Sequence, residues 1–208
     1  GRFSIKAPAP GACLLRIPRI GYLPVAWTVR LAEGETLTRM MALAGESADG
    51  LMTHPTNTGP RFLREIARPA LENGAKRSGR NVENVRIIAS PFVATGATAA
   101  AVKRERERIR EHFGFLYSTP QYATTLELHG WKDVGDHLHK LTRAGKWDEL
   151  TAQISDEILD ALVPSGTYAD IATIIRDWFA DACTGIALRM PESSKDDAAF
   201  GKVVTALQ

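Results

Sequence analysis

The chain has 208 residues, of which 44% are hydrophobic, and this length suits one folded domain with a sizeable core. Its formal net charge at pH 7 is only +2, so the composition gives no reason to expect nucleic acid or a membrane as a partner. No apolar run approaches the roughly 18 residues of a membrane-spanning helix. The start at Gly1 lacks both a secretion signal and an initiator Met. We therefore expect a chain that was processed or that begins inside a longer reading frame.

The first half of the chain predicts alternating strands and helices. Residues 1–24 are rich in Pro and Gly and predict an irregular segment or a hairpin. The apolar run 25–31 predicts a strand, and Thr36 is a suitable N-cap for the amphipathic helix that follows. A sharp turn then leads into a short buried strand at 50–53. Strand, helix and strand in this order form a βαβ unit, whose two strands would run parallel.

Further units of the same kind follow. Pro60 stands where the first turn of a helix tolerates proline, and this helix is predicted to end near Gly74 or Gly79. The stretch 85–95 is rich in β-branched residues and predicts the clearest strand of the chain, with a long charged helix after it. Three β-then-α units in a row predict a parallel α/β sheet. A closed (β/α)8 barrel needs eight strands and about 250 residues, so this chain cannot form one unaided.

The second half predicts mainly helices, with one short strand at 185–190 and a closing helix at 196–207. We therefore expect a single domain with three parts. These parts are the irregular segment 1–24, the βα units at 25–117 and a helical carboxyl-terminal region at 118–208.

Several residues invite a functional interpretation that the pattern does not favour. His129, His137 and His139 suggest a metal site, but residues two apart on a helix point in different directions and cannot share one ion. Acidic residues interleave the basic run 103–108, which favours a solvated helix face over a nucleic-acid stripe. The chain has no P-loop, no G-x-S-x-G elbow, no zinc spacing and no G-x-G-x-x-G.

The two cysteines bear on the compartment. Cys13 and Cys183 are far apart in sequence and form no C-x-x-C pair. This favours two reduced, partly buried thiols in a cytoplasmic protein over a disulfide or a metal pair.

Ligands of parallel α/β proteins gather at the carboxyl ends of the strands, here residues 33–38 and 53–57. His54 in the second segment could orient a cofactor or shuttle a proton, because the unperturbed pKa of a histidine side chain lies near 6.5. The alternative is a strand-end histidine that hydrogen-bonds to nearby backbone.

Six ordered stretches carry a resemblance to a known family. They are residues 39–51, 54–57, 60–65, 86–96, 116–122 and 162–167. Together they resemble the carboxyl-terminal part of the bacterial luciferase-like family of flavin- and deazaflavin-dependent oxidoreductases. The branch they are most similar to is an actinobacterial type that depends on coenzyme F420. The resemblance covers roughly residues 38–208 and only faintly the segment before.

The resemblance implies the α/β fold of a TIM barrel, present here only as its carboxyl-terminal part. Its last three parallel strands would be 25–31, 50–53 and 85–95, and the first five strands would be absent. Those five normally carry much of the cofactor-ring pocket and the groups that act on the substrate. The implied partner is a second copy in a homo-oligomer or a complementing amino-terminal barrel half. A truncated barrel could instead be a non-catalytic binding or assembly module, or a fragment without function, because open sheet edges favour pairing with another chain.

The resemblance also implies a cofactor and its site. Coenzyme F420, or alternatively FMN, would serve hydride transfer or monooxygenation of a small organic substrate. The family's phosphate-binding loop falls on Gly34, Glu35 and Thr36, with Thr38 nearby, and Thr53 and His54 would lie near the cofactor. Free amides at a helix N-terminus suit a phosphate. Glu33 and Glu35 depart from the family's small, Gly-rich loop, so either their side chains point away or the phosphate site has decayed.

Overall fold

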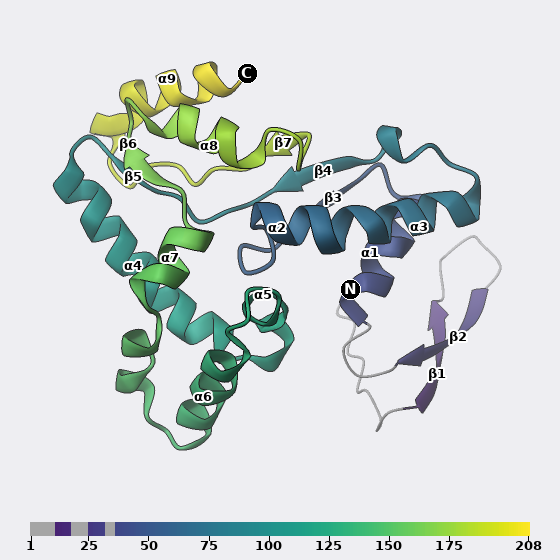
Figure 1. Cartoon of the computed structure of the whole chain (residues 1–208). Coiled ribbons are helices and arrows are strands. Elements are labelled where there is room, and N and C mark those ends of the chain that lie inside the picture. Colours follow the sequence, from purple (N-terminus) through teal and green to yellow (C-terminus); the bar gives the residue numbers. More distant parts are fainter. Residues whose placement is uncertain (1–10, 18–24, 32–35) are drawn as a thin grey trace.

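Helices and short strands alternate along the chain (Figure 1). The computed structural model describes residues 11–17, 25–31 and 36–208, with side chains from Leu37 on. The strands are β1 (Gly11–Ile17), β2 (Val25–Leu31), β3 (Gly50–Met52), β4 (Arg86–Ala89), β5 (Ala94–Gly96), β6 (Ser165–Thr167) and β7 (Gly185–Ile186). The helices are α1 (Thr36–Ser47), α2 (Pro60–Phe62), α3 (Arg68–Ser78), α4 (Ala99–Tyr117), α5 (Thr124–Leu128), α6 (Lys132–Arg143), α7 (Asp156–Leu162), α8 (Ile171–Phe179) and α9 (Asp197–Leu207).

Three parallel strands form the central sheet, in the order β3-β4-β7. Leu51 of β3 lies opposite Ile87 of β4, and Ala89 of β4 lies opposite Ile186 of β7. Within the described residues this sheet stays open. The predicted fold class, a parallel α/β sheet that forms part of a barrel, is confirmed.

The predicted place of the strand at 25–31 is wrong. β2 has the predicted bounds, but it pairs antiparallel with β1, with Gly11 opposite Leu31, and not parallel with β3. An antiparallel partner a few residues away satisfies the strand's backbone hydrogen bonds locally. The third parallel strand is β7, which lies within the predicted strand at 185–190 and pairs with β4.

The predicted strand at 85–95 is divided in two. β4 ends at Ala89, and β5 begins at Ala94 and pairs parallel with β6 in a separate sheet. Pro91 lies between the two strands and has no N–H group to donate to a ladder, which explains why the chain leaves the central sheet there.

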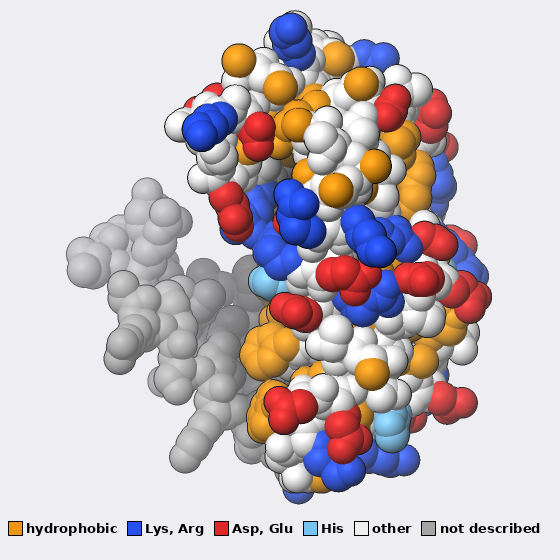
Figure 2. Space-filling model, turned by 90° about the vertical axis from the view of Figure 1, so that its left-hand side faces the viewer, with side chains coloured by type: hydrophobic (Ala, Val, Ile, Leu, Met, Phe, Trp, Pro, Cys, Tyr) orange, Lys and Arg blue, Asp and Glu red, His pale blue; other side chains and the backbone are white. Residues whose placement is uncertain are grey.

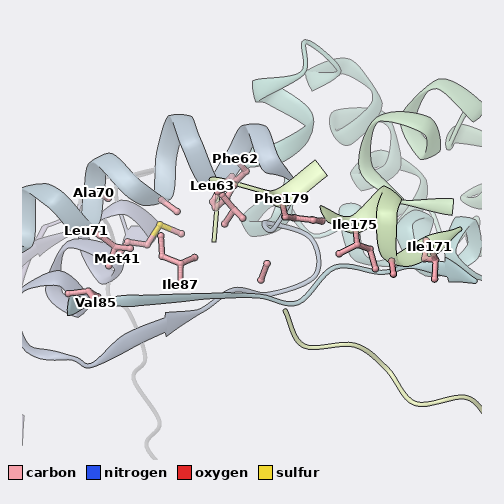
Figure 3. Close-up of a cluster of buried hydrophobic side chains, with 14 of the residues drawn as sticks. Met41, Phe62, Leu63, Ala70, Leu71, Val85, Ile87, Ile171, Ile175 and Phe179 are labelled. Atoms are coloured by element: carbon pink, nitrogen blue, oxygen red, sulfur yellow. The ribbon is translucent and has the colours of Figure 1, made fainter. Parts of the chain in front are cut away.

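One face of the central sheet is buried under α1, α3 and α8. Ile87 and Ala89 are 3% and 0% exposed, and Figure 3 shows apolar side chains from the helices gathered over Ile87. Side chains alternate along a strand, so Arg86 lies on the opposite face, as does Met52 of β3. Arg86 is exposed, and Met52 is 65% exposed.

The contact between α1 and α3 depends on two glycines. A Cβ atom added at Gly74 would lie 1.7 Å from the Ala42 carbonyl oxygen, and one at Gly45 would lie 2.1 Å from the Leu71 carbonyl oxygen. Gly74 therefore lies inside α3 as a contact point. Of the two predicted ends, the helix uses the second, with Gly79 in the left-handed region at φ 70°.

A second apolar core joins α4 to α6 and α7. It includes Ile109 and Phe113 of α4, Leu138 of α6 and Ile158 of α7. α4 leads away from the sheet toward α5 and α6 (Figure 1). No helix in the described ranges is both long and apolar enough to cross a bilayer.

Candidate functional site

A cavity of about 340 Å³ lies at the carboxyl ends of the central strands. Residues 90–93, which follow β4, and residues 187–189, which follow β7, form much of its wall. Pro55, just beyond β3, is also part of the wall, and α4 contributes Glu105 and Arg108. The cavity therefore occupies the end of the sheet at which parallel α/β proteins bind ligands.

Two hydroxyl groups in the cavity wall have no hydrogen-bond partner among the described residues. They belong to Ser90 and Thr95, and both oxygens are buried. An unpaired buried polar group costs about 1–3 kcal/mol, and such groups in native proteins often mark functional positions.

The α4 side of the cavity carries an ion pair. Arg108 Nε donates to Glu105 Oε2 at 2.8 Å, and a second contact joins the same groups. The hydrogen bond to Glu105 raises the pKa of the Arg108 guanidinium, and both side chains are about one quarter exposed. This wall is therefore polar but balanced in charge.

The prediction of a solvated face at 103–108 holds for part of that run. Lys103 and Arg104 are exposed, whereas Arg106 is half-buried and pairs with Asp160 of α7. Figure 2 shows basic and acidic side chains intermixed across the face that carries α4. Two arginines of α4, Arg106 and Arg110, therefore join α4 to α7, and Arg108 lines the cavity.

Thr53 and Thr58 tie the end of β3 to the end of β4. Thr53 is 6% exposed, and its Oγ1 lies 2.6 Å from Oγ1 of Thr58. The Ser90 N–H donates to Thr58 Oγ1 at 3.0 Å. The predicted role of Thr53 in cofactor binding stays a prediction, since its hydroxyl group already has partners within the protein.

His54 is exposed directly after Thr53, at the carboxyl edge of the sheet. Its Nδ1 lies 2.8 Å from Thr56 Oγ1. Its ring stacks on Tyr122, with centroids 4.8 Å apart and planes 7° apart. The structure thus brings a histidine, a threonine and a tyrosine together next to the cavity wall at Pro55.

Most of the predicted phosphate loop lies outside the described residues. Gly34 and Glu35 lie outside the described residues, and Thr36 begins α1 with an undescribed side chain. Thr38 is exposed in the first turn of α1. These four positions remain predictions as cofactor ligands.

Metal-binding clusters and cysteine pairs give no further candidate. The described residues contain no group of three or more His, Cys, Asp or Glu side chains able to hold a metal ion. Cys183 is a free, half-buried thiol, and burial raises its pKa. The side chain of Cys13 is outside the described set.

Sequence reasoning missed several residues of the site. Ser90 follows β4 directly, so the rule that ligands gather at strand ends could have found it. Tyr122 lies in one of the stretches that carry the family resemblance and Arg108 in the basic run, but neither pattern placed them at the site, because the helix and loop that bring them there are placed by packing with distant parts of the chain.

Comparisons with known proteins agree with this fold. The luciferase-like monooxygenase family matches residues 33–184. Uncharacterized proteins of Mycobacterium bovis and of two strains of Mycobacterium tuberculosis are each 36% identical over 167 residues, which are 80% of this chain and 47% of theirs. The chain thus spans about half the length of the curated relatives it matches.

A solved structure is similar in fold. The coenzyme F420-dependent tetrahydromethanopterin reductase from Methanopyrus kandleri matches with a TM-score of 0.61 and 19% identity, over 80% of this chain and 46% of that chain. At this identity the likeness concerns the fold alone. The family match covers most of the chain, and the chain belongs to the luciferase-like monooxygenase family.

Proposed function

We propose that this chain is the carboxyl-terminal portion of a luciferase-like oxidoreductase that acts on a small organic substrate. With coenzyme F420 the reaction would be hydride transfer, and with FMN it would be monooxygenation. The observation that carries the proposal is the cavity at the carboxyl ends of β4 and β7, in a chain of this family. The Methanopyrus kandleri reductase, which is similar in fold, depends on coenzyme F420, and this favours coenzyme F420 over FMN.

The wall of the cavity suits an amphipathic, planar ligand. Phe92, Val93 and Leu188 offer apolar surface, and Ser90 and Thr95 offer hydroxyl groups without a partner among the described residues. A bound flavin or deazaflavin supplies the redox chemistry, and the protein binds it, orients it and excludes water.

A phosphate site and a histidine complete the proposed contacts with the cofactor. The amides around Gly34 and Glu35, together with Thr36 and Thr38 at the start of α1, would bind the phosphate, because helix N-termini favour anions. His54 would lie near the ring.

The proposal includes a second polypeptide segment that completes the site. Met52, 65% exposed, and the exposed Arg86 lie on the face of the central sheet opposite Ile87 and Ala89. An amino-terminal barrel half would cover this face, and a second copy of the chain is the alternative partner.

Fluorescence titration tests this function. Coenzyme F420 and FMN are titrated into the chain alone and into the chain mixed with the amino-terminal half of a longer family member. We expect weak binding of F420 to the chain alone and binding about tenfold tighter, equal to 1.4 kcal/mol, in the mixture. No binding of either cofactor in either sample would overturn the proposal.

An assembly module is the second candidate function, and the exposed Met52 favours it. Analytical ultracentrifugation of the same samples separates the two. A chain that self-associates and binds neither cofactor would support the module, whereas a cofactor-binding chain supports the oxidoreductase.

A further inference from the structure

The turn after β3 is held in place by two helices. The buried Tyr117 hydroxyl of α4 donates to the Thr56 carbonyl oxygen at 3.0 Å. Thr125 Oγ1 of α5 donates to Asn57 Oδ1 at 2.9 Å. Within the turn, the Asn57 N–H donates to the His54 carbonyl oxygen at 2.8 Å. The backbone that carries His54 is therefore fixed by groups distant in sequence.

The His54 side chain is also fixed, although it is exposed. The Thr56 N–H donates to His54 Nδ1 at 3.4 Å, and Thr56 Oγ1 lies 2.8 Å from the same nitrogen. The backbone N–H donor assigns Nδ1 as an acceptor, so we assign the proton of the neutral ring to Nε2, with the Thr56 hydroxyl group also donating to Nδ1. Stacking on Tyr122 then restrains rotation of the ring plane.

The other ring nitrogen is available to a ligand. Within the described part of the chain, Nε2 of His54 has no hydrogen-bond partner. An exposed side chain normally keeps its rotamer freedom, and here two contacts remove it. The neighbouring residue Pro55 forms part of the cavity wall, so the restrained donor lies at the border of the cavity.

We propose that Thr56 and Tyr122 are positioning residues that hold His54 as a hydrogen-bond donor, with Nε2–H presented to an oxygen atom of a bound small molecule. The oxygen belongs to a carbonyl group or to an anionic group, because both accept from an N–H donor. The identity of the molecule as cofactor or substrate rests on the proposed function. The restraint of the ring is independent of it.

Nitrogen-15 NMR of the histidine rings tests the restraint in the chain without ligand. At a pH where the ring is neutral, wild-type His54, assigned through His54→Gln, should show an unprotonated Nδ1 and a protonated Nε2. Thr56→Val, which keeps the backbone donor but loses the closer hydroxyl contact, and Tyr122→Leu should each move the ring-nitrogen shifts part of the way toward averaged values. Tyr122→Phe should match wild type, because stacking needs the ring and not the hydroxyl group. Gln121→Ala, a change at an exposed neighbour, is the matched control.

Two NMR results would overturn the restraint. One is a protonated Nδ1 in wild type. The other is an unchanged His54 spectrum in both Thr56→Val and Tyr122→Leu, with backbone spectra that show intact folds.

Titration with coenzyme F420 tests the donor role. His54→Ala should weaken binding by about three- to tenfold, the usual effect of one lost hydrogen bond. Tyr122→Leu should weaken it less, and the control Gln121→Ala should leave it unchanged. Equal affinity of wild type and His54→Ala would overturn the donor role. If wild type binds neither F420 nor FMN, the proposed function and the donor role both fail, and the NMR result alone decides the restraint.

Discussion

The two faces of the central sheet are completed to different degrees by this chain. On the helix-covered face, Ile87 and Ala89 are almost fully buried by residues of α1, α3 and α8. On the other face, Met52 is 65% exposed and Arg86 is also exposed. Among the described residues, the helix-covered face is therefore the more fully buried, and the other face keeps two exposed side chains beside a half-buried Ile88.

The largest expected effect concerns the helix-covered face. Gly74→Ala would place a methyl group 1.7 Å from the Ala42 carbonyl oxygen, so α1 and α3 must move apart. We expect the free energy of unfolding in urea to fall by about 3 kcal/mol. Gly201→Ala in α9, where no atom lies within 4 Å of the added carbon, is the control and should stabilise the chain by about 0.5–1 kcal/mol. Wild-type stability of Gly74→Ala would refute the close contact.

A second pair of variants compares the two faces directly. Ile87→Ala removes buried apolar volume and should lower the free energy of unfolding by about 2–5 kcal/mol. Met52→Ala removes an exposed side chain and should change it by no more than about 0.5 kcal/mol. Chemical denaturation of both variants measures the difference. Similar losses would mean that both faces are packed within the chain.

The helix-covered face was the part most open to prediction. The apolar spacing of α1 and the β-branched residues of β4 are local patterns; α1 formed where expected, and β4 formed in the first part of the predicted strand. The strand that pairs with β2 could not be predicted from a local pattern, because strand pairing depends on competition between segments of the chain. Pro91 did carry a signal for the division of 85–95, since proline interrupts a strand ladder.

The candidate site was predictable only at strand ends. His54 stands where the rule for parallel sheets places functional residues. Tyr122 lies in a short 3-10 turn at Pro120–Tyr122, and Arg108 lies on α4. Both segments pack against the second apolar core, and no local pattern encodes that placement.

Ion pairs outside the central sheet should make the smallest contribution to the stability of the fold. Hydrogen bonds to Arg110 lower the pKa of Glu107 and of Asp156 below their ordinary values of 4.5 and 3.8. Groups with a lowered folded-state pKa stabilise the fold at neutral pH. This contribution is lost as the pH falls below the ordinary pKa and through the lowered folded-state pKa. Because both carboxylates are largely exposed, the contribution is small.

Thermal unfolding measured between about pH 5 and pH 3 checks this expectation. The double variant Glu107→Gln/Asp156→Asn should lose less stability than wild type over that range. An equal or steeper loss in the double variant would show that these pairs do not stabilise the fold.

The most direct test of the account is a map of backbone amide shifts on addition of coenzyme F420 to the isotope-labelled chain. The account predicts that the shifts concentrate at the cavity, at Ser90, Thr95 and Arg108, and at His54 beside it, with little change at Ile87 under the helices. Shifts that avoid the carboxyl ends of β3, β4 and β7, or no shifts at saturating F420 and FMN, would contradict it.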